Sequence, residues 1–116
     1  MRVLVCGGRE YNDYQKVELV LGAAHKAQLF GTVIHGAARG ADSLAGRWAK
    51  ENNIPVEEFP ADWNRYGRRA GYIRNAQMLK EGKPELVIAF PGGPGTKMMV
   101  ELARSAGVVT VVVQGE

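Results

Sequence analysis

Cysteine and long hydrophobic runs are almost absent from this chain, and both absences narrow what it can be. The single cysteine, Cys6, excludes an intramolecular disulfide. No stretch approaches the roughly 18 apolar residues that a membrane-spanning helix needs. The N-terminal residues, MRVLVCGG, form too short a stretch for a signal peptide and contain no small-residue cleavage site. We therefore expect a cytoplasmic protein with no membrane partner.

What the chain does contain is typical of one globular domain. Its 116 residues are 46% hydrophobic, which suits a single core, and we expect one domain over residues 1–116. The net charge of +3 suits an anionic ligand without requiring a polyanion. Glycine is enriched, and its 15 copies gather in predicted loops rather than in a low-complexity run.

Short apolar runs alternate along the chain with segments of helical periodicity. The most apolar run, 86–90, is expected to be a central strand, whereas 54–59 has charges in its middle and is expected near an edge. Only 60–71 shows no clear period and is expected to be irregular. The alternation is typical of an α/β fold: a single Rossmann-like domain whose five-stranded parallel sheet has helices on both faces. Right-handed crossovers favour the strand order 3-2-1-4-5. The predicted strands are 3–6, 32–35, 54–59, 86–90 and 108–113.

Three glycine-containing loops follow the first, second and fourth predicted strands. They read CGGRE at 6–10, HGAARGAD at 35–42 and PGGPGT at 91–96. The carboxyl ends of parallel strands meet at one edge of the sheet, where α/β proteins bind ligands. Glycine lets backbone amides approach a ligand closely, and the helix N-terminus after the third loop favours an anion. We therefore predict a phosphate site; the alternative is that the glycines only make tight turns. The predicted ligand-binding residues are Gly7, Gly8, Arg9, Gly36, Arg39, Asp42, Arg74, Gly92, Gly93, Gly95 and Thr96.

This predicted site differs from the common nucleotide-binding motifs. A Walker A loop needs G-x-x-x-x-G-K-[ST], and Lys97 lies inside the predicted helix instead. The stretch GAARGA does not match G-x-G-x-x-G either. The sequence therefore supports neither an ATPase nor a typical dinucleotide dehydrogenase. No cluster of histidine, cysteine and aspartate has the spacing of a metal site, so we expect no metal ion and no cofactor.

An arginine-rich segment with interleaved aromatic residues spans 61–75 and reads ADWNRYGRRAGYIRN. Guanidinium groups pair with phosphate, and aromatic faces stack on bases or sugars. The alternative is a solvated basic surface with one or two aromatics in the core, and Trp63 by itself is expected in the core. Arg74 is the best candidate for a catalytic or phosphate-binding group. Its alternative is a surface ion pair with Glu81 or Glu85.

Three further residues have open interpretations. Asp42, early in the second predicted helix, is expected either to cap that helix or to accept a hydrogen bond from a ribose hydroxyl. Cys6 and His35 end adjacent strands, and a cysteine–histidine nucleophile is one interpretation. We favour a small buried thiol over that nucleophile.

Four motifs together resemble the YspA-related domain of the SLOG superfamily. They are GGREYND at 7–13, HGAARGADSLAGRWAKENNIPVEEFPADW at 35–63, GRRAGYIRNAQML at 67–79 and AFPGGPGTKMMVELARSAGV at 89–108. The superfamily also includes the LONELY GUY phosphoribohydrolases, the lysine decarboxylase-like proteins and the DNA-processing protein DprA. The resemblance covers nearly the whole chain. It implies a Rossmann-like fold that binds nucleotides or nucleotide-derived ligands at the glycine-rich edge, and it implies no particular reaction.

One motif of the LONELY GUY enzymes is only partly matched. These enzymes cleave the N-glycosidic bond of nucleoside monophosphates and carry PGGxGTxxE, with an arginine on the preceding helix. The resemblance matches 91–96 to the phosphate half of this motif and Arg74 to the arginine, but the glutamate position falls on Met99. A thioether can neither stabilise a cation-like sugar nor orient water. Glu10 and Asp42 are the remaining carboxylates that a rearranged site would use.

We therefore expect a sensor or binding module for a nucleotide or nucleotide-derived phosphate, such as an ADP-ribose-like ligand or a nucleoside monophosphate. One alternative is an enzyme, a nucleoside 5′-monophosphate phosphoribohydrolase-like hydrolase with a relocated acid. A second alternative is DprA-like binding of single-stranded DNA by the arginines of 65–74. We also consider a homodimer, for which Met98 and Met99 offer an apolar patch.

Overall fold

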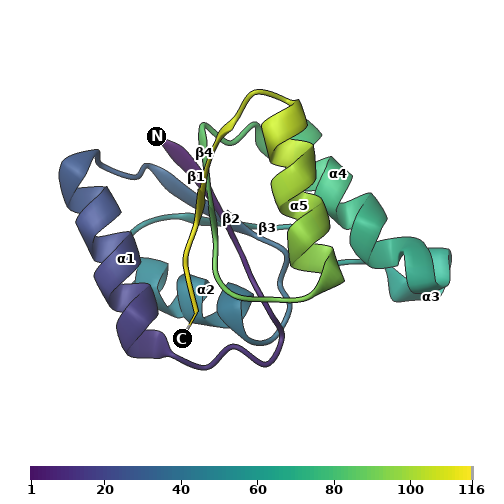
Figure 1. Cartoon of the computed structure of the whole chain (residues 1–116), viewed down its shortest axis with the longest axis horizontal. Coiled ribbons are helices and arrows are strands. Elements are labelled where there is room, and N and C mark those ends of the chain that lie inside the picture. Colours follow the sequence, from purple (N-terminus) through teal and green to yellow (C-terminus); the bar gives the residue numbers. More distant parts are fainter. Residues whose placement is uncertain (116) are drawn as a thin grey trace.

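A five-stranded parallel sheet forms the centre of the protein (Figure 1). The computed structural model describes residues 1–115, and its strands lie in the order β3-β2-β1-β4-β5. All four neighbouring pairs are parallel, which confirms the predicted α/β class, Rossmann-like layout and strand order. The strands are β1 (Arg2–Cys6), β2 (Thr32–His35), β3 (Val56–Glu58), β4 (Leu86–Ala89) and β5 (Val109–Val112).

Helices cover both faces of the sheet, as the sequence predicts (Figure 1). Side chains alternate along β1, so Val3 and Val5 pack in the cluster with α1 and α2, whereas Leu4 and Cys6 pack in the cluster with α4 and α5. The strand is therefore buried on both sides and occupies the middle of the sheet, with β4 beside it. The helices are α1 (Tyr14–Ala27), α2 (Ala41–Glu51), α3 (Trp63–Tyr66), α4 (Ala70–Gly82) and α5 (Pro94–Ser105).

Local signals set where the helices begin and end. The Asp13 side chain accepts a hydrogen bond from the Lys16 amide at 3.0 Å and caps α1. Helix α4 ends where Lys83 adopts a left-handed backbone conformation (φ 48°), directly before Pro84. Because the strands are parallel, α2 and α5 both begin at the carboxyl edge of the sheet, directly after glycine loops.

The segment expected to be irregular, 60–71, is instead largely helical. Asp62 accepts from the Arg65 amide at 3.1 Å and caps the single turn of α3, which a 3₁₀ turn (Gly67–Arg69) joins to α4. Helical periodicity cannot be recognised over so few residues, because one turn shows no repeat. No side chain of α3 or of the 3₁₀ turn is buried, so this segment lies on the surface.

Two other expectations concern the surface. Strand β3 lies at one edge of the sheet and is largely exposed, which confirms the edge position predicted for the charged third strand. The proposed apolar patch of Met98 and Met99 is wrong, because Met99 is 0% exposed and packs in the core between α4 and α5.

Within residues 1–115, no helix is both long and apolar enough to cross a membrane.

Candidate functional site

The glycine loops meet at the carboxyl edge of the sheet through backbone hydrogen bonds. The Gly8 amide donates to the Pro91 carbonyl at 2.9 Å, and the Gly8 carbonyl accepts from the Ala41 amide at 3.1 Å. A Cβ on Gly92 would lie only 2.6 Å from the amide nitrogen of Gly8, so any larger residue there would push the two loops apart. Part of the glycine content therefore serves close packing between loops, a structural role distinct from both phosphate binding and tight turns.

The loop after β4 has an open backbone at its end. A Cβ built on Gly93 or on Gly95 would meet no atom within 4 Å. Gly93 precedes α5 and no side chain caps this helix. The first backbone bond of the helix joins the Lys97 amide to the Gly93 carbonyl at 3.1 Å, so the amides of Gly95 and Thr96 precede it. Free amides and the positive end of the helix dipole favour an anion here.

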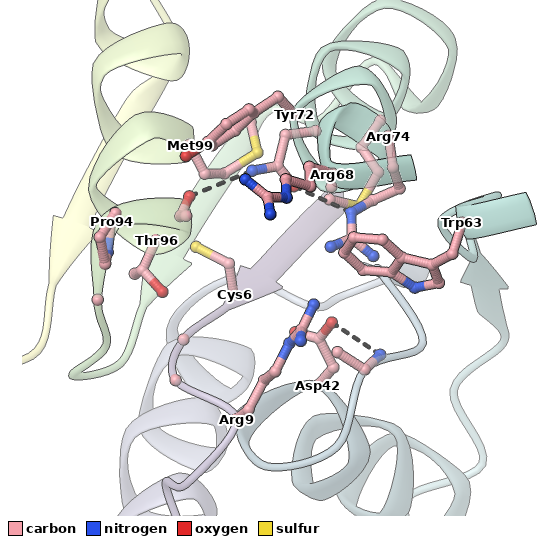
Figure 2. A pocket seen from close by; sticks show the side chains of 18 residues that line it. Cys6, Arg9, Asp42, Trp63, Arg68, Tyr72, Arg74, Pro94, Thr96 and Met99 are labelled. Atoms are coloured by element: carbon pink, nitrogen blue, oxygen red, sulfur yellow. Dashed lines mark hydrogen bonds between the residues drawn. The ribbon is translucent and has the colours of Figure 1, made fainter. Parts of the chain in front are cut away.

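A pocket of about 380 Å³ opens between this end of α5 and helix α4 (Figure 2). We call it the inner pocket, and its volume falls in the range of small-molecule sites. Its walls come from the loops after β1, β2 and β4 and from the helical segment after β3. The predicted site residues that line it are Gly7, Gly8, Arg9, Asp42, Arg74, Gly93, Gly95 and Thr96.

Arg74 joins two sides of the inner pocket. Its Nη1 donates to the Gly36 carbonyl. Its Nε donates to Asn75 Oδ1 at 3.0 Å (Figure 2). These bonds, rather than the alternative ion pair with Glu81 or Glu85, hold the guanidinium; Glu85 accepts from the Arg2 amide at 2.9 Å. Burial lowers the pKa of Arg74, but a guanidinium remains charged at neutral pH.

The expectation that Trp63 lies in the core is wrong. Its side chain is 47% exposed and forms part of the pocket wall. The Arg9 guanidinium lies 5.1 Å from the centre of the Trp63 ring, a cation–π contact between the loop after β1 and α3 (Figure 2). Arg68 and Tyr72 add another cation and another aromatic face to the same wall. The arginine-rich segment therefore borders the pocket, as one interpretation of the sequence proposes.

The Asp42 carboxylate does not cap helix α2, and it is already hydrogen-bonded within the protein. No side chain caps α2; instead Asp42 Oδ2 accepts from the amides of Gly36 at 3.1 Å and Ala38 at 3.2 Å. Ala37 between them has a left-handed backbone (φ 58°), which turns both amides toward the one carboxylate. The Gly36 amide thus binds an internal anion in this structure. Burial raises the pKa of Asp42, and the hydrogen bond from Ala38 and the charges of His35 and Arg74 partly oppose this rise.

Cys6 and His35 do not form a nucleophilic pair in their present states. Burial raises the pKa of the Cys6 thiol to about 12, so it stays protonated, which fits the favoured buried thiol. His35 Nδ1 accepts from the Ala37 amide at 2.9 Å, and its Nε2 lies 3.7 Å from Glu58 Oε2. Burial lowers the pKa of His35, and the charges of Asp42 and Glu58 partly offset this effect.

A second pocket, of about 340 Å³, adjoins the first, and we call it the outer pocket. It contains Gly36 and Arg39, two predicted residues that are absent from the inner lining, and it shares Arg9, Ala38, Trp63 and Arg74 with the inner pocket. Arg39 is exposed and forms an ion pair with Glu10 at 2.5 Å. Gly92, the remaining predicted residue, lines neither pocket.

Comparison with known proteins identifies the family. The profile of the YspA, cpYpsA-related SLOG family matches residues 1–66. The chain is also 35% identical to the Gene 61 protein of Mycobacterium phage D29 over an alignment of 118 residues, and the alignment covers 95% of this chain and 94% of that protein. The chain belongs to this SLOG family. The resemblance drawn from the four motifs is thereby confirmed.

Within this SLOG site, Met99 occupies the position where the LONELY GUY motif has its glutamate. Its side chain is fully buried but still touches the inner pocket (Figure 2). The carboxylate that lines the inner pocket is that of Asp42, and its Oδ2 is already held by two amides. Among residues 1–115, no group of three His, Cys, Asp or Glu side chains is placed to hold a metal ion.

Sequence reasoning missed Asn75. This residue is buried on the core side of α4, where its Nδ2 donates to the Gly95 carbonyl at 3.1 Å while its Oδ1 accepts from Arg74. It therefore fixes the first turn of α5 against α4. A usable signal exists: Asn75 is a polar residue three positions before the buried Met78 on the apolar face of a helix, where a lone amide needs partners.

Proposed function

We propose that the protein binds a nucleotide or nucleotide-derived phosphate in the inner pocket and acts as a sensor or binding module. The observation that carries this proposal is the placement of three arginines, Arg9, Arg68 and Arg74, in the pocket that the uncapped N-terminus of α5 enters. Among residues 1–115, three guanidinium groups and one carboxylate, that of Asp42, line this pocket, which leaves an excess of positive charge. Membership of the SLOG family supports a nucleotide-related ligand.

Each part of such a ligand has matching chemistry in the pocket. A phosphate fits the amides of Gly95 and Thr96, with Arg74 as its charged partner. A base fits the exposed ring of Trp63 or Tyr72, since aromatic side chains stack on planar rings. Together these groups bind a phosphate at one end of a ligand and a ring at the other.

A binding role is favoured over catalysis because the position of the glutamate in the LONELY GUY motif is occupied by Met99, which is not a carboxylic acid. Met99 cannot stabilise a cation-like sugar. The second candidate, a nucleoside monophosphate hydrolase, rests on one observation: the carboxylate of Asp42 lines the same pocket. Its Oδ2 already accepts two backbone amides, so it is committed to holding the loop after β2.

The test is a thermal-shift screen over nucleoside monophosphates, nucleotide sugars and dinucleotides, followed by calorimetric titration of the compounds that stabilise the protein. Gly93→Val should weaken their binding at least about tenfold, because its side chain would stand where the backbone approaches phosphate. The fold should tolerate the change, since a Cβ at Gly93 meets no atom within 4 Å.

Gly22→Val is the matched control. A Cβ at Gly22 also meets nothing within 4 Å, and this residue lies on α1, away from the pocket lining. It should leave nucleotide affinity unchanged. If Gly93→Val binds nucleotides as tightly as the parent protein, the phosphate site lies elsewhere and the proposal is wrong.

Single-stranded nucleic acid is the other ligand that the surface fits. Trp63, Tyr66 and Tyr72 are exposed beside the arginines of 65–74, which is the combination that binds unpaired strands. Salt separates the two ligands: binding to a nucleic acid backbone falls steeply between 50 and 200 mM salt, and binding of a small ligand in a pocket falls much less.

A further inference from the structure

The two edges of the sheet differ in how they are protected from pairing with another strand. At one edge, β3 carries the charges of Glu57 and Glu58, and Pro55 and Pro60 flank it. Charge and proline are features that keep an edge strand from pairing. At the other edge lies β5, where the stretch 107–114 reads GVVTVVVQ and contains neither a charged residue nor a proline. The edge at β5 is therefore open to another strand.

Apolar side chains on β5 are left largely without cover. Val109 is 65% exposed and Val111 is 45% exposed. They lie opposite Leu86 and Ile88 of β4, which pack in the cluster with α1 and α2, so both valines point to that face of the sheet. Helices α1 and α2 therefore leave much of this edge strand uncovered.

The backbone of β5 directs hydrogen-bonding groups away from the sheet. The Val113 amide donates to the Ala89 carbonyl of β4 at 2.8 Å. Because backbone groups alternate in direction along a strand, the amide and carbonyl of Val111 also point to β4. Those of Thr110 and Val112 point outward from the free edge. Such outward groups are a template for a further strand.

A row of charges runs beside this edge on the other face of the sheet. Lys97, Glu101 and Arg104 follow one another along α5 at helical spacing and line a groove of about 580 Å³ between α5 and the end of β5. Among residues 1–115, no ion pair within the chain uses any of the three. The order positive, negative, positive is self-complementary: where two copies of the row run antiparallel, Glu101 of each lies beside a cation of the other.

We infer that β5 is the surface through which two copies of this chain pair, antiparallel, about a two-fold axis perpendicular to the sheet. Such an axis keeps each face of the sheet on its own side, and it passes at Val111. Thr110 of each copy then exchanges backbone hydrogen bonds with Val112 of the other, and Val111 meets its own counterpart. The two α5 helices lie antiparallel on one face with their charged rows side by side.

This pairing surface is separate from the candidate ligand site. Val111, Glu101 and Arg104 do not line the inner pocket, and Met99 takes no part in the contact because it is buried. The inference therefore does not depend on the proposed nucleotide binding.

Sedimentation equilibrium of the whole chain between about 1 and 500 μM tests the pairing. We expect a reversible dimer with a Kd in the micromolar range, because a strand of 4 residues makes a small interface. Val111→Lys should weaken dimerisation at least about tenfold, since it sets two ammonium groups against each other at the axis. Val56→Lys is the matched control: Val56 is 38% exposed on the opposite edge strand, and its replacement should leave the dimer Kd unchanged.

Glu101→Lys is a second variant, and it does not touch the sheet. Glu101 is exposed on α5, so the fold should be kept while the whole row becomes positive. The dimer Kd should rise by about three- to tenfold. The rise should be larger at low salt than at high salt, because salt screens exposed charges.

Cysteine variants test where the axis lies. Residues directly opposite each other at the axis have Cα atoms about 4.5 Å apart, which is within the range of a disulfide. Mild oxidation with oxidised glutathione should therefore link two copies of Val111→Cys. Two copies of Val109→Cys should not be linked, because their Cα atoms would lie about 13 Å apart along the strands. The native Cys6 is buried and stays out of this reaction.

The outcomes decide the inference in either direction. A protein that stays monomeric over the whole range, or a dimer whose Kd is unchanged in both Val111→Lys and Glu101→Lys, would overturn it. Efficient linking of Val109→Cys in place of Val111→Cys would overturn it as well, because a different residue would then lie at the axis. Denaturant unfolding checks that Val111→Lys is folded; if it is not, Glu101→Lys and the cysteine variants decide.

Discussion

The guanidinium of Arg74 donates a hydrogen bond to the backbone carbonyl of Gly36, so one side chain joins helix α4 to the loop after β2. The same guanidinium donates to Asn75, whose amide group donates to the Gly95 carbonyl at the start of α5. Three segments that are distant in sequence thus share one polar network. The geometry of the anion site at α5 depends on this network, because it fixes the helix ends that surround the pocket.

Replacing Arg74 should therefore affect both binding and stability. Arg74→Ala should weaken nucleotide affinity at least about tenfold, since a charge-assisted contact contributes roughly 1.5–3 kcal/mol. It should also lower the free energy of unfolding by about 1–3 kcal/mol, because the Gly36 carbonyl and Asn75 lose a donor. Calorimetric titration measures the first effect and denaturant unfolding the second.

Arg65→Ala is the matched control for this prediction. The Arg65 guanidinium carbon lies 5.0 Å from the centre of the Tyr66 ring within α3, and Arg65 lines neither pocket. It should change affinity and stability much less. An Arg74→Ala variant that retains the parent affinity would remove Arg74 from the site, even if its stability has fallen.

Sequence alone was sufficient for the sheet but not for the details of the site. Apolar runs alternating with helical periodicity fix the strand order, because parallel strands and right-handed crossovers leave few arrangements. The prediction that Trp63 is buried is wrong because it relied on residue type, and tryptophan is on average a well-buried residue. Trp63 instead lies on the single turn of α3, none of whose residues is buried, so its side chain is exposed. Asp42 accepts two loop amides only because Ala37 has a left-handed backbone. Alanine rarely adopts this conformation, so the local sequence does not predict it.

Asp42 offers a prediction about charge. In Asp42→Asn, the amide oxygen can still accept from Gly36 and Ala38, so the loop should keep its shape while one negative charge leaves the pocket. Affinity for an anionic nucleotide should rise by about three- to tenfold. Asp42→Ala leaves both backbone amides without their acceptor and should lower the free energy of unfolding by about 1–3 kcal/mol. An unchanged affinity in Asp42→Asn would mean that the anion binds far from this carboxylate.

The lowered pKa of His35 leads to a prediction about how the free energy of unfolding depends on pH. Burial holds its pKa in the folded protein below the ordinary value of 6.5, so the unfolded chain binds a proton more readily in this range. The free energy of unfolding should therefore decrease as the pH falls below about 6.5. Protonation at Nδ1 would also remove the acceptor of the Ala37 amide.

The measurement is denaturant unfolding between about pH 5.5 and 7.5. Asp42, whose pKa burial raises, acts in the opposite direction, because the folded protein binds this proton more readily than the unfolded chain does. His35→Asn keeps an acceptor for the Ala37 amide and removes the titrating ring. This variant should flatten the pH dependence, and a slope equal to that of the parent protein would assign the effect to another group.

The last prediction concerns catalysis at Met99. The parent protein should release little or no adenine from AMP, because cleavage of an N-glycosidic bond passes through a cation-like sugar that a carboxylate stabilises. Met99 brings no charge to the pocket, and Asp42 is occupied by the loop amides. Chromatography of AMP incubations measures the product directly. Met99→Glu is the complementary variant: its stability is checked first, because a buried carboxylate is costly, and a folded variant that gains adenine release would reveal a latent hydrolase site. Robust release by the parent protein, lost in Arg74→Ala, would instead show that the pocket already hydrolyses nucleotides and that a binding module is the wrong description.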